Sequence, residues 1–172
     1  MEGDIWIHGA AQLSGYFSTG VLQPVSCCEG VGTGDRGFLT ADGALYVTGR
    51  SKDLMIINGR NVWPSDVEAA ASQNTGIAQE HMQLLKSGGL VDQQFNLVLL
   101  LHEKGVRQSP KHNALKLAAA AATAAAGSKV RACVVPNGAI AFTSSGKKAR
   151  AFTLARFDNA QIPILADSEA SH

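Results

Sequence analysis

The feature that most constrains the fold is an alanine-rich segment at residues 115–127, which has an apolar run on either side. Alanine has the highest intrinsic helix propensity, so the segment is expected to be a helix and not a low-complexity linker. Ser109-Pro110 before it and Gly127 at its end are typical of a helix that starts at proline and stops at glycine. The flanking runs in "QFNLVLLLHEK" and "SKVRACVVP" suit strands, the first at the centre of a covered sheet. This pattern predicts helices packed on a sheet.

Neighbouring segments extend this mixed pattern. The string "PSDVEAAASQNTG" starts with Pro64, contains the capping-box pair Ser65 and Glu68 and ends at Gly76, which predicts another helix. "IAQEHMQLLKS" is a further strand candidate, "NGAIAFTSSGKK" a loop and "ARAFTLARFD" a short final helix. The residues after Ile162 are expected to fray.

The first 49 residues differ, because they are rich in glycine and in short β-prone runs such as "DIWIHG" and "GALYVTG". Asp42-Gly43 predicts a hairpin turn, and "LMIING" is expected to turn at Asn58-Gly59 into "RNVW". A β segment of about 50 residues is small for an independent fold. We therefore expect an α+β chain with a β-rich segment at 1–49, a joint at 50–53, a compact α+β domain with about three strands and flanking helices at 54–160, and a tail at 161–172.

Composition excludes several classes of protein. Hydrophobic residues make up 45% and charged residues 17%, as in a folded soluble chain, and the net charge of +1 gives no footprint for nucleic acid or a membrane surface. The alanine-rich run is too weakly apolar to span a bilayer, and the acidic start is unlike a signal peptide, which favours a cytoplasmic location. Cys27, Cys28 and Cys133 lack metal-like spacing and are interpreted as thiols, with a Cys27 to Cys28 vicinal bridge as the alternative. The five histidines are scattered, so no metal site is expected.

Two short strings imitate nucleotide-binding loops. "GTGDRG" at residues 32–37 satisfies the G-x-G-x-x-G pattern, and Asp53 lies about 20 residues further on, where a ribose-binding acid would be. That loop needs a helix directly after it, whereas a hairpin follows here, so the glycines are interpreted as turn and hairpin geometry. "SSGKK" is not a Walker loop, because Ala141 replaces the first glycine and Lys148 the required Ser or Thr.

A set of strings in order is more specific: "GDIWIHG" with "GYF", then "TGDRGFL", then "DGALYVTGRSKDLMIINGRNVWPSDVE", then "TSSGK". Over about residues 2–155 this order resembles the C-terminal part of the AMP-forming acyl-activating enzymes, which include acyl-CoA synthetases, fatty acyl-AMP ligases and peptide-synthetase adenylation domains. "GRNVWPSDVE" is most similar to the form in fatty acyl-AMP ligases. The resemblance implies that residues 1–49 end the large adenylating domain and that residues 54–160 form the mobile C-terminal domain.

The resemblance also implies roles for single residues. Asp35 matches the aspartate that accepts hydrogen bonds from the adenylate ribose hydroxyls, and Arg50 matches an arginine at the ribose and phosphate. Lys147 matches the mobile-loop lysine that reaches the carboxylate and the α-phosphate, where a cation stabilises developing charge. Lys52 and Asp53 match the hinge about which the small domain rotates between two half-reactions.

Two residues match the path of the acceptor thiol. Gly59 matches the glycine that lets a thiol arm pass close to the backbone, and Asn61 stands where many CoA-using relatives carry arginine. Taken alone, Asp66 and Glu68 are interpreted as acids that serve the helix dipole.

The loop around Lys147 departs from the pattern of the relatives, because Ala141 and Phe142 replace Pro and Lys, and Lys148 replaces an apolar residue. The phosphate loop, the acyl pocket and the acidic magnesium ligand of the family do not occur in this sequence.

We expect ATP and Mg²⁺ in the full-length enzyme, with CoA or the phosphopantetheine arm of a carrier protein as acceptor. The expected partners are the large N-terminal domain, a fatty acid and an acyl carrier protein, and the fragment alone is expected to be inactive. The alternative is a non-catalytic module that docks a carrier protein or a partner subunit.

Overall fold

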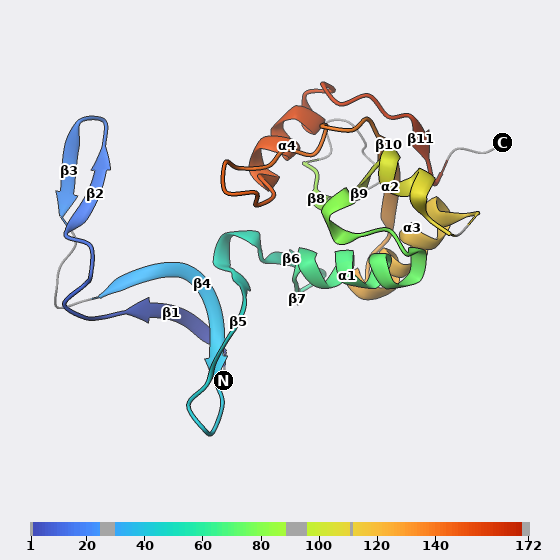
Figure 1. Cartoon of the computed structure of the whole chain (residues 1–172). Coiled ribbons are helices and arrows are strands. Elements are labelled where there is room, and N and C mark those ends of the chain that lie inside the picture. The colour runs from blue at the N-terminus through green and yellow to red at the C-terminus, as the bar shows by residue number, and fades with distance from the viewer. Residues whose placement is uncertain (1, 25–29, 89–95, 111, 170–172) are drawn as a thin grey trace. The chain divides into compact units, whose positions relative to one another are not determined.

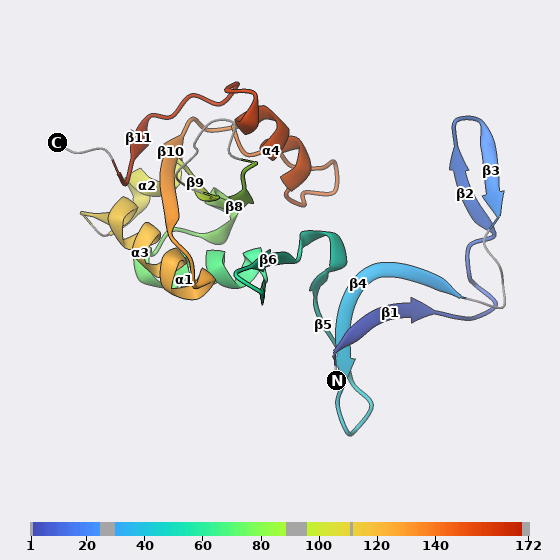
Figure 2. The ribbon, with the colours of Figure 1, turned by 180° about the vertical axis from the view of Figure 1, so that it is seen from behind.

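The computed structural model of the chain describes residues 2–24, 30–88, 96–110 and 112–169. The chain divides into two compact units, Met1–Leu54 and Met55–His172. Figure 1 shows the ribbon with its elements labelled, and Figure 2 shows it from behind. Each unit is described by itself. Cys27 and Cys28 lie outside the described residues, and Cys133 is buried.

In the part of the first unit that the structure describes, residues 2–24 and 30–54, the regular elements are β strands and one short 3₁₀ turn. Its three-stranded antiparallel sheet has the order β1-β4-β5, and β2 and β3 form a separate hairpin. Thr40 and Ala44 close the turn between β4 and β5, where Gly43 has a φ of 85°, so the predicted Asp42-Gly43 hairpin is confirmed. The elements are β1 (Gly3–Ile7), β2 (Gly15–Ser18), β3 (Val21–Pro24), β4 (Val31–Leu39), β5 (Leu45–Arg50) and η1 (Ser51–Asp53).

The second unit contains a four-stranded mixed sheet with the order β11-β10-β9-β8. β10 runs parallel to β9, while β8 and β11 are antiparallel to their neighbours. A hairpin precedes the first helix, with Asn58 and Gly59 at φ values of 49° and 76°, which confirms the predicted turn. The elements are β6 (Met55–Ile57), β7 (Arg60–Val62), α1 (Pro64–Thr75), η2 (Gln79–His81), β8 (Met82–Lys86), β9 (Leu97–His102), α2 (Glu103–Gln108), α3 (Ala114–Ala126), β10 (Val130–Val135), α4 (Arg150–Asp158) and β11 (Ala166–Asp167).

Both faces of this sheet are covered. Leu97, Leu99 and Leu101 of β9 belong to a core cluster with α1 and α3, and the residues between them belong to a second cluster with Phe157 of α4 and Ile162. Figures 1 and 2 both show α1 and α3 side by side. Side chains that alternate along a strand and are buried on both sides explain the continuous apolar run. The expected α+β class is confirmed.

Several details of the sequence prediction are wrong. The sheet has a fourth strand, because β11 pairs with Cys133 and Val134 of β10, so the residues after Ile162 do not simply fray. An ion pair between Arg131 and Asp167 holds this strand. The helix α3 begins after Asn113 and not at Pro110, and the short helix α2 lies where strand "QFNLVLLLHEK" was expected to continue.

No described helix has both the length and the apolar character needed to cross a membrane.

Candidate functional site

Asp35 and Arg50, which the sequence assigns to nucleotide binding, lie opposite each other in β4 and β5. The Nε atom of Arg50 is 3.2 Å from Oδ1 of Asp35, and their side chains are 58% and 32% exposed. An exposed pair of this kind adds at most about 1 kcal/mol of stability. It does present a carboxylate that accepts hydrogen bonds next to a guanidinium that donates several, which suits a hydroxyl-bearing anionic ligand.

The position of Asp35 depends on an irregularity in β4. The register between β1 and β4 shifts between Asp4 and Trp6, and Gly34 in the extra segment has a φ of 75°. The hydroxyl of Thr33 donates to the carbonyl of Ile5 at 3.1 Å and accepts from the N–H of Asp35 at 3.0 Å. Bulges of this kind redirect the following side chain. The glycines of "GTGDRG" therefore lie inside β4, the first strand of the β4–β5 hairpin, so the hairpin interpretation is confirmed and the turn interpretation is wrong.

The proposed hinge residues Lys52 and Asp53 lie in η1, with Lys52 exposed and Asp53 partly buried. The hydroxyl of Ser51, in the same turn, donates to Oδ1 of Asp4 at 2.9 Å. The division between the two units falls after Leu54, one residue beyond this turn.

Gly59 and Asn61 lie in the β6–β7 hairpin of the second unit and are both exposed. Gly59 has a left-handed φ of 76°, which favours glycine. Among the described residues, no atom lies within 4 Å of where a Cβ on Gly59 would be, so the backbone is open to solvent there.

Lys147 lies in a short hairpin before α4, in the segment that the sequence analysis describes only as a loop; the segment is orange in Figure 1. Phe142 and Lys148 form an antiparallel bridge, and the N–H of Thr143 donates to the carbonyl of Lys147 at 2.7 Å. The N–H of Gly146 donates to the carbonyl of Thr143 at 2.9 Å, and the N–H of Lys147 donates to the Thr143 hydroxyl at 3.1 Å. The hairpin leaves the Lys147 side chain exposed.

Of the sequence-predicted residues, the structure brings Asp35 and Arg50 into contact. Lys147 lies in the hairpin before α4, Gly59 and Asn61 in β6–β7, and Lys52 and Asp53 in η1. Across the described ranges, no group of three or more His, Cys, Asp or Glu side chains could hold a metal ion.

No protein-family profile matches the chain. Among curated proteins it is 31% identical to the putative fatty-acid–CoA ligase fadD21 of Mycobacterium leprae, over 95% of this chain and 31% of that protein. It is 28% identical to the long-chain-fatty-acid–AMP ligase FadD26 of Mycobacterium marinum, over 90% of this chain and 29% of that protein. A solved chain from a study of fatty acyl-adenylate ligases from E. coli and L. pneumophila is 34% identical, with a TM-score of 0.70 over 93% of this chain and 28% of that chain.

The chain is similar to the C-terminal part of the AMP-forming acyl-activating enzymes. Both the sequence and the fold carry this similarity over most of the chain, as the ordered strings predicted. The ligase-like chain spans 31% of the length of fadD21 and 29% of that of FadD26.

The chain also contains a buried ionic cluster that was not predicted from the sequence. Glu68 of α1 is 2% exposed, and its Oε1 accepts from the N–H of Leu84 at 2.8 Å and from Nη1 of Arg150 at 2.5 Å. Its Oε2 accepts from Nζ of Lys148 at 2.6 Å, and Lys148 also donates to the carbonyl of Gln79 at 2.7 Å.

This cluster corrects the interpretation of Glu68. The residue at the N-cap of α1 is Trp63, without a side-chain cap, so Ser65 and Glu68 do not form a capping box. Glu68 shares the buried face of α1 with Pro64 and Ala71, four residues before it and three after it. Residues at this spacing lie on one face of a helix, so Glu68 falls on the apolar face of α1. This spacing is the sequence signal from which the burial of Glu68 could have been predicted.

Two histidines also meet inside the ligase-like chain, although they are far apart in the sequence. The rings of His81 and His102 have centroids 6.0 Å apart, and Nε2 of His102 accepts from the N–H of Ile140 at 3.3 Å. Burial lowers the pKa of His102, and the nearby His81 and Lys148 lower it further.

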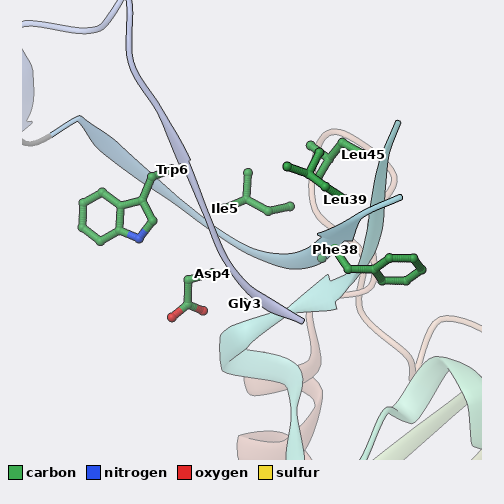
Figure 3. Close-up of a pocket in the computed structure, with 8 residues that line it drawn as sticks. Gly3, Asp4, Ile5, Trp6, Phe38, Leu39 and Leu45 are labelled. Carbon is green, nitrogen blue, oxygen red and sulfur yellow. The ribbon is translucent and has the colours of Figure 1, made fainter. Parts of the chain in front are cut away.

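An open hollow in the first unit has mostly apolar walls from β1, β4 and β5. Figure 3 shows Leu39 and Leu45 side by side, with Ile5 directed toward them. Leu39 is 66% and Leu45 51% exposed. Apolar side chains exposed together are more typical of a surface that packs against protein than of a nucleotide site. The residues that line the hollow are Gly3, Asp4, Ile5, Trp6, Gly37, Phe38, Leu39 and Leu45.

Proposed function

We propose that the chain is the C-terminal part of an ATP-dependent fatty acyl-AMP ligase. The whole enzyme forms acyl-adenylate and pyrophosphate from a fatty acid and ATP, and then transfers the acyl group to a carrier-protein thiol or to CoA. The observation that carries this proposal is the exposed Lys147 on a hydrogen-bonded hairpin, in a chain 34% identical to a fatty acyl-adenylate ligase chain over 93% of its length.

In this reaction a carboxylate oxygen of the fatty acid bonds to the α-phosphorus of ATP while the bond from that phosphorus to the β-phosphate oxygen breaks. Two anions must approach each other, and negative charge develops on the oxygens around phosphorus. The ammonium of Lys147 attracts both anions and stabilises that charge, without donating or accepting a proton. An exposed lysine on a short hairpin can enter such a site without rearranging a core.

Asp35 and Arg50 bind the nucleotide in this proposal. The Asp35 carboxylate accepts hydrogen bonds from the ribose hydroxyls, and Arg50 contacts the ribose and phosphate region. Their ion pair supports these roles, because it holds the two side chains in one orientation on the sheet while Arg50 stays exposed and Asp35 stays partly accessible. Lys52 and Asp53 form the hinge between the two parts of the enzyme.

Magnesium supplies charge neutralisation at the ATP phosphates when it is bound. Its acidic ligand is proposed to lie in the large domain, as the resemblance to the family implies. The large domain is likewise proposed to carry the phosphate loop and the acyl pocket, so this chain alone is inactive. A cytoplasmic location stays a prediction.

The acceptor thiol is proposed to reach the site past Gly59 and Asn61. The open backbone at Gly59 supports this path. Asn61 lacks the charge with which an arginine would bind the phosphates of CoA, which favours a carrier-protein arm. Thioester formation from preformed acyl-adenylate, measured with CoA and with acyl carrier protein, distinguishes the two acceptors.

The test is ATP–pyrophosphate exchange in the full-length parent with a fatty acid. Lys147→Ala should lower the exchange rate by about 10²- to 10³-fold, which is typical of losing one charge-stabilising group. Lys116→Ala, which removes an exposed lysine from α3, should leave the rate unchanged. Wild-type exchange in Lys147→Ala would remove the catalytic role of this lysine. A parent that binds a carrier protein but shows no exchange would instead favour the non-catalytic docking module.

A further inference from the structure

Lys148 follows the proposed catalytic lysine directly, yet its surroundings are opposite in character. Lys147 is exposed, whereas the side chain of Lys148 is 17% exposed and that of its partner Glu68 is 3% exposed. Adjacent residues of an extended segment point to opposite sides. Fixing the side chain of Lys148 on the domain therefore determines the direction in which Lys147 points away from it.

The contacts of Lys148 tie the hairpin to two separate elements. Its ammonium bonds Oε2 of Glu68 in α1 at 2.6 Å and the carbonyl of Gln79 in η2 at 2.7 Å. On the far side of the bridge, the N–H of Ala149 donates to the carbonyl of Ala141 at 2.8 Å. The hairpin is thus held at its base, and Lys147 is the next residue from this base toward the turn.

Arg150 completes this attachment at the start of α4. Its Nη1 donates to Oε1 of Glu68 at 2.5 Å and to the carbonyl of Leu84 at 3.1 Å. The two cations therefore use different oxygens of one buried carboxylate. Burial lowers the pKa of the Lys148 ammonium, and the nearby charge of Arg150 lowers it further, whereas Glu68 acts in the opposite direction. The charged form of Lys148 is therefore destabilised by its burial.

We infer that Lys148 is a positioning residue for adenylation: together with Glu68 and Arg150 it anchors the hairpin that presents Lys147. This inference rests on the proposed function for its effect on catalysis, whereas the anchor itself is a property of the chain. An apolar side chain at position 148 would leave Oε2 of Glu68 without this cation and the hairpin without its bond to Gln79.

Amide hydrogen exchange of the 172-residue chain tests the anchor without any reaction. Lys148→Met should accelerate exchange at residues 143, 146, 147 and 149 by about tenfold or more beyond any change at amides of α1 and β9, because local opening of the hairpin becomes easier in addition to any loss of global stability. Lys148→Arg should restore the protection, and Lys116→Met should change nothing. If Lys148→Met does not fold, Lys148→Gln removes the same charge and answers the same question. Unchanged hairpin exchange in a folded variant overturns the inference.

Kinetics of the full-length parent test the consequence. Lys148→Met should lower kcat of adenylation by about 10- to 100-fold, as expected for a misplaced catalytic group, with little change in KM for ATP and recovery in Lys148→Arg. An unchanged kcat beside faster hairpin exchange overturns the positioning role. A wild-type parent without any adenylation refutes the proposed function, and the hydrogen-exchange result then still decides whether the anchor exists.

Discussion

At the scale of single residues, the energetics of the second unit depend on how Glu68 is paired. Glu68 is 2% exposed, and burying a charged carboxylate without partners is strongly unfavourable. Two cations and the N–H of Leu84 offset this penalty. Such a cluster adds little net stability, but removing one charge from it leaves the others buried without compensation.

Glu68→Gln is therefore expected to lower the free energy of unfolding by about 3–5 kcal/mol, since Lys148 and Arg150 would lose their counter-charge. Urea denaturation of the 172-residue chain at neutral pH measures the loss. The matched control is Glu80→Gln, at an acid whose side chain is 74% exposed, and it should stay within about 0.5 kcal/mol of wild type. Equal effects of the two variants would contradict the structural role of the buried carboxylate.

His102 gives a prediction about pH. Its folded-state pKa lies below the ordinary value of 6.5, so between these two values the unfolded chain binds more protons than the folded chain. The contribution of His102 to stability is therefore full above about pH 6.5 and falls as the pH is lowered through this window.

Urea unfolding at pH 7.5 and at pH 5.5 checks this sign. Wild type should lose stability on acidification, and His102→Gln, whose side-chain oxygen can still accept from Ile140, should lose less. The control variant His112→Gln changes an exposed histidine and should behave as wild type. A larger loss in His102→Gln than in wild type would show that the sign is wrong.

At the scale of elements, α3 packs through a stripe of small residues. Ala114, Ala118, Ala122 and Ala126 recur at four-residue spacing and are all buried, in the cluster that also contains α1 and the sheet. Residues at this spacing lie on one face of a helix, and alanine lets two helices approach closely. The composition that predicted this helix also determines how it packs.

Ala122→Leu should destabilise the chain by about 1–3 kcal/mol, because added methylenes in a filled interface force neighbours apart. The same change at the exposed Ala120 introduces the same side chain on the outer face and should have an effect below about 0.5 kcal/mol. Thermal unfolding followed by circular dichroism compares the two variants. Equal melting temperatures would mean that the alanine stripe is not tightly packed.

The sequence predicted elements well where local chemistry decides them. Gly43 and Asn58-Gly59 specify tight turns by their backbone preferences, and Gly127 ends α3 in the left-handed conformation. β11 was missed because two residues carry no periodicity, and its pairing with β10 depends on tertiary contacts such as that of Arg131 with Asp167. The start of α3 was misplaced because Pro110 is compatible with the turn before a helix as well as with its first residue.

At the scale of the whole molecule, the candidate site could be predicted as a set of residues but not as an arrangement. The motif order identified Asp35 and Arg50, yet their contact depends on the register of β4 and β5, which a shift near Gly37 sets. The same holds for Lys148, whose partner Glu68 is 80 positions away in the sequence. Contacts between residues far apart in the sequence depend on sheet register and helix packing. They could not be predicted here from the local pattern of a single sequence.

The two units are expected to differ in stability, because among the residues that the structure describes an apolar core is found in the second unit alone. Both core clusters lie wholly within Met55–His172. In Met1–Leu54 the described residues that are buried are Gly30 and Gly37, while Trp6, Leu39 and Tyr46 are each more than half exposed. β strands without an apolar core unfold locally at little cost in free energy. A protease, which cleaves extended chain, can then cut them.

Limited proteolysis with thermolysin should therefore cut the chain first within residues 2–54 and leave a fragment close to Met55–His172, identified by mass spectrometry. Cleavage within α1, β9 or β10 should be about 10²-fold slower, since it requires opening of the packed sheet. The chain in denaturing urea, cut in both parts at similar rates, controls for the preference of the protease. First cuts within the second unit would contradict this difference, because they would mean that its two covered sheet faces do not protect it. Resistance of residues 2–54 in the full-length parent, beside their cleavage in this chain, would show that the apolar side chains of β1, β4 and β5 are covered there.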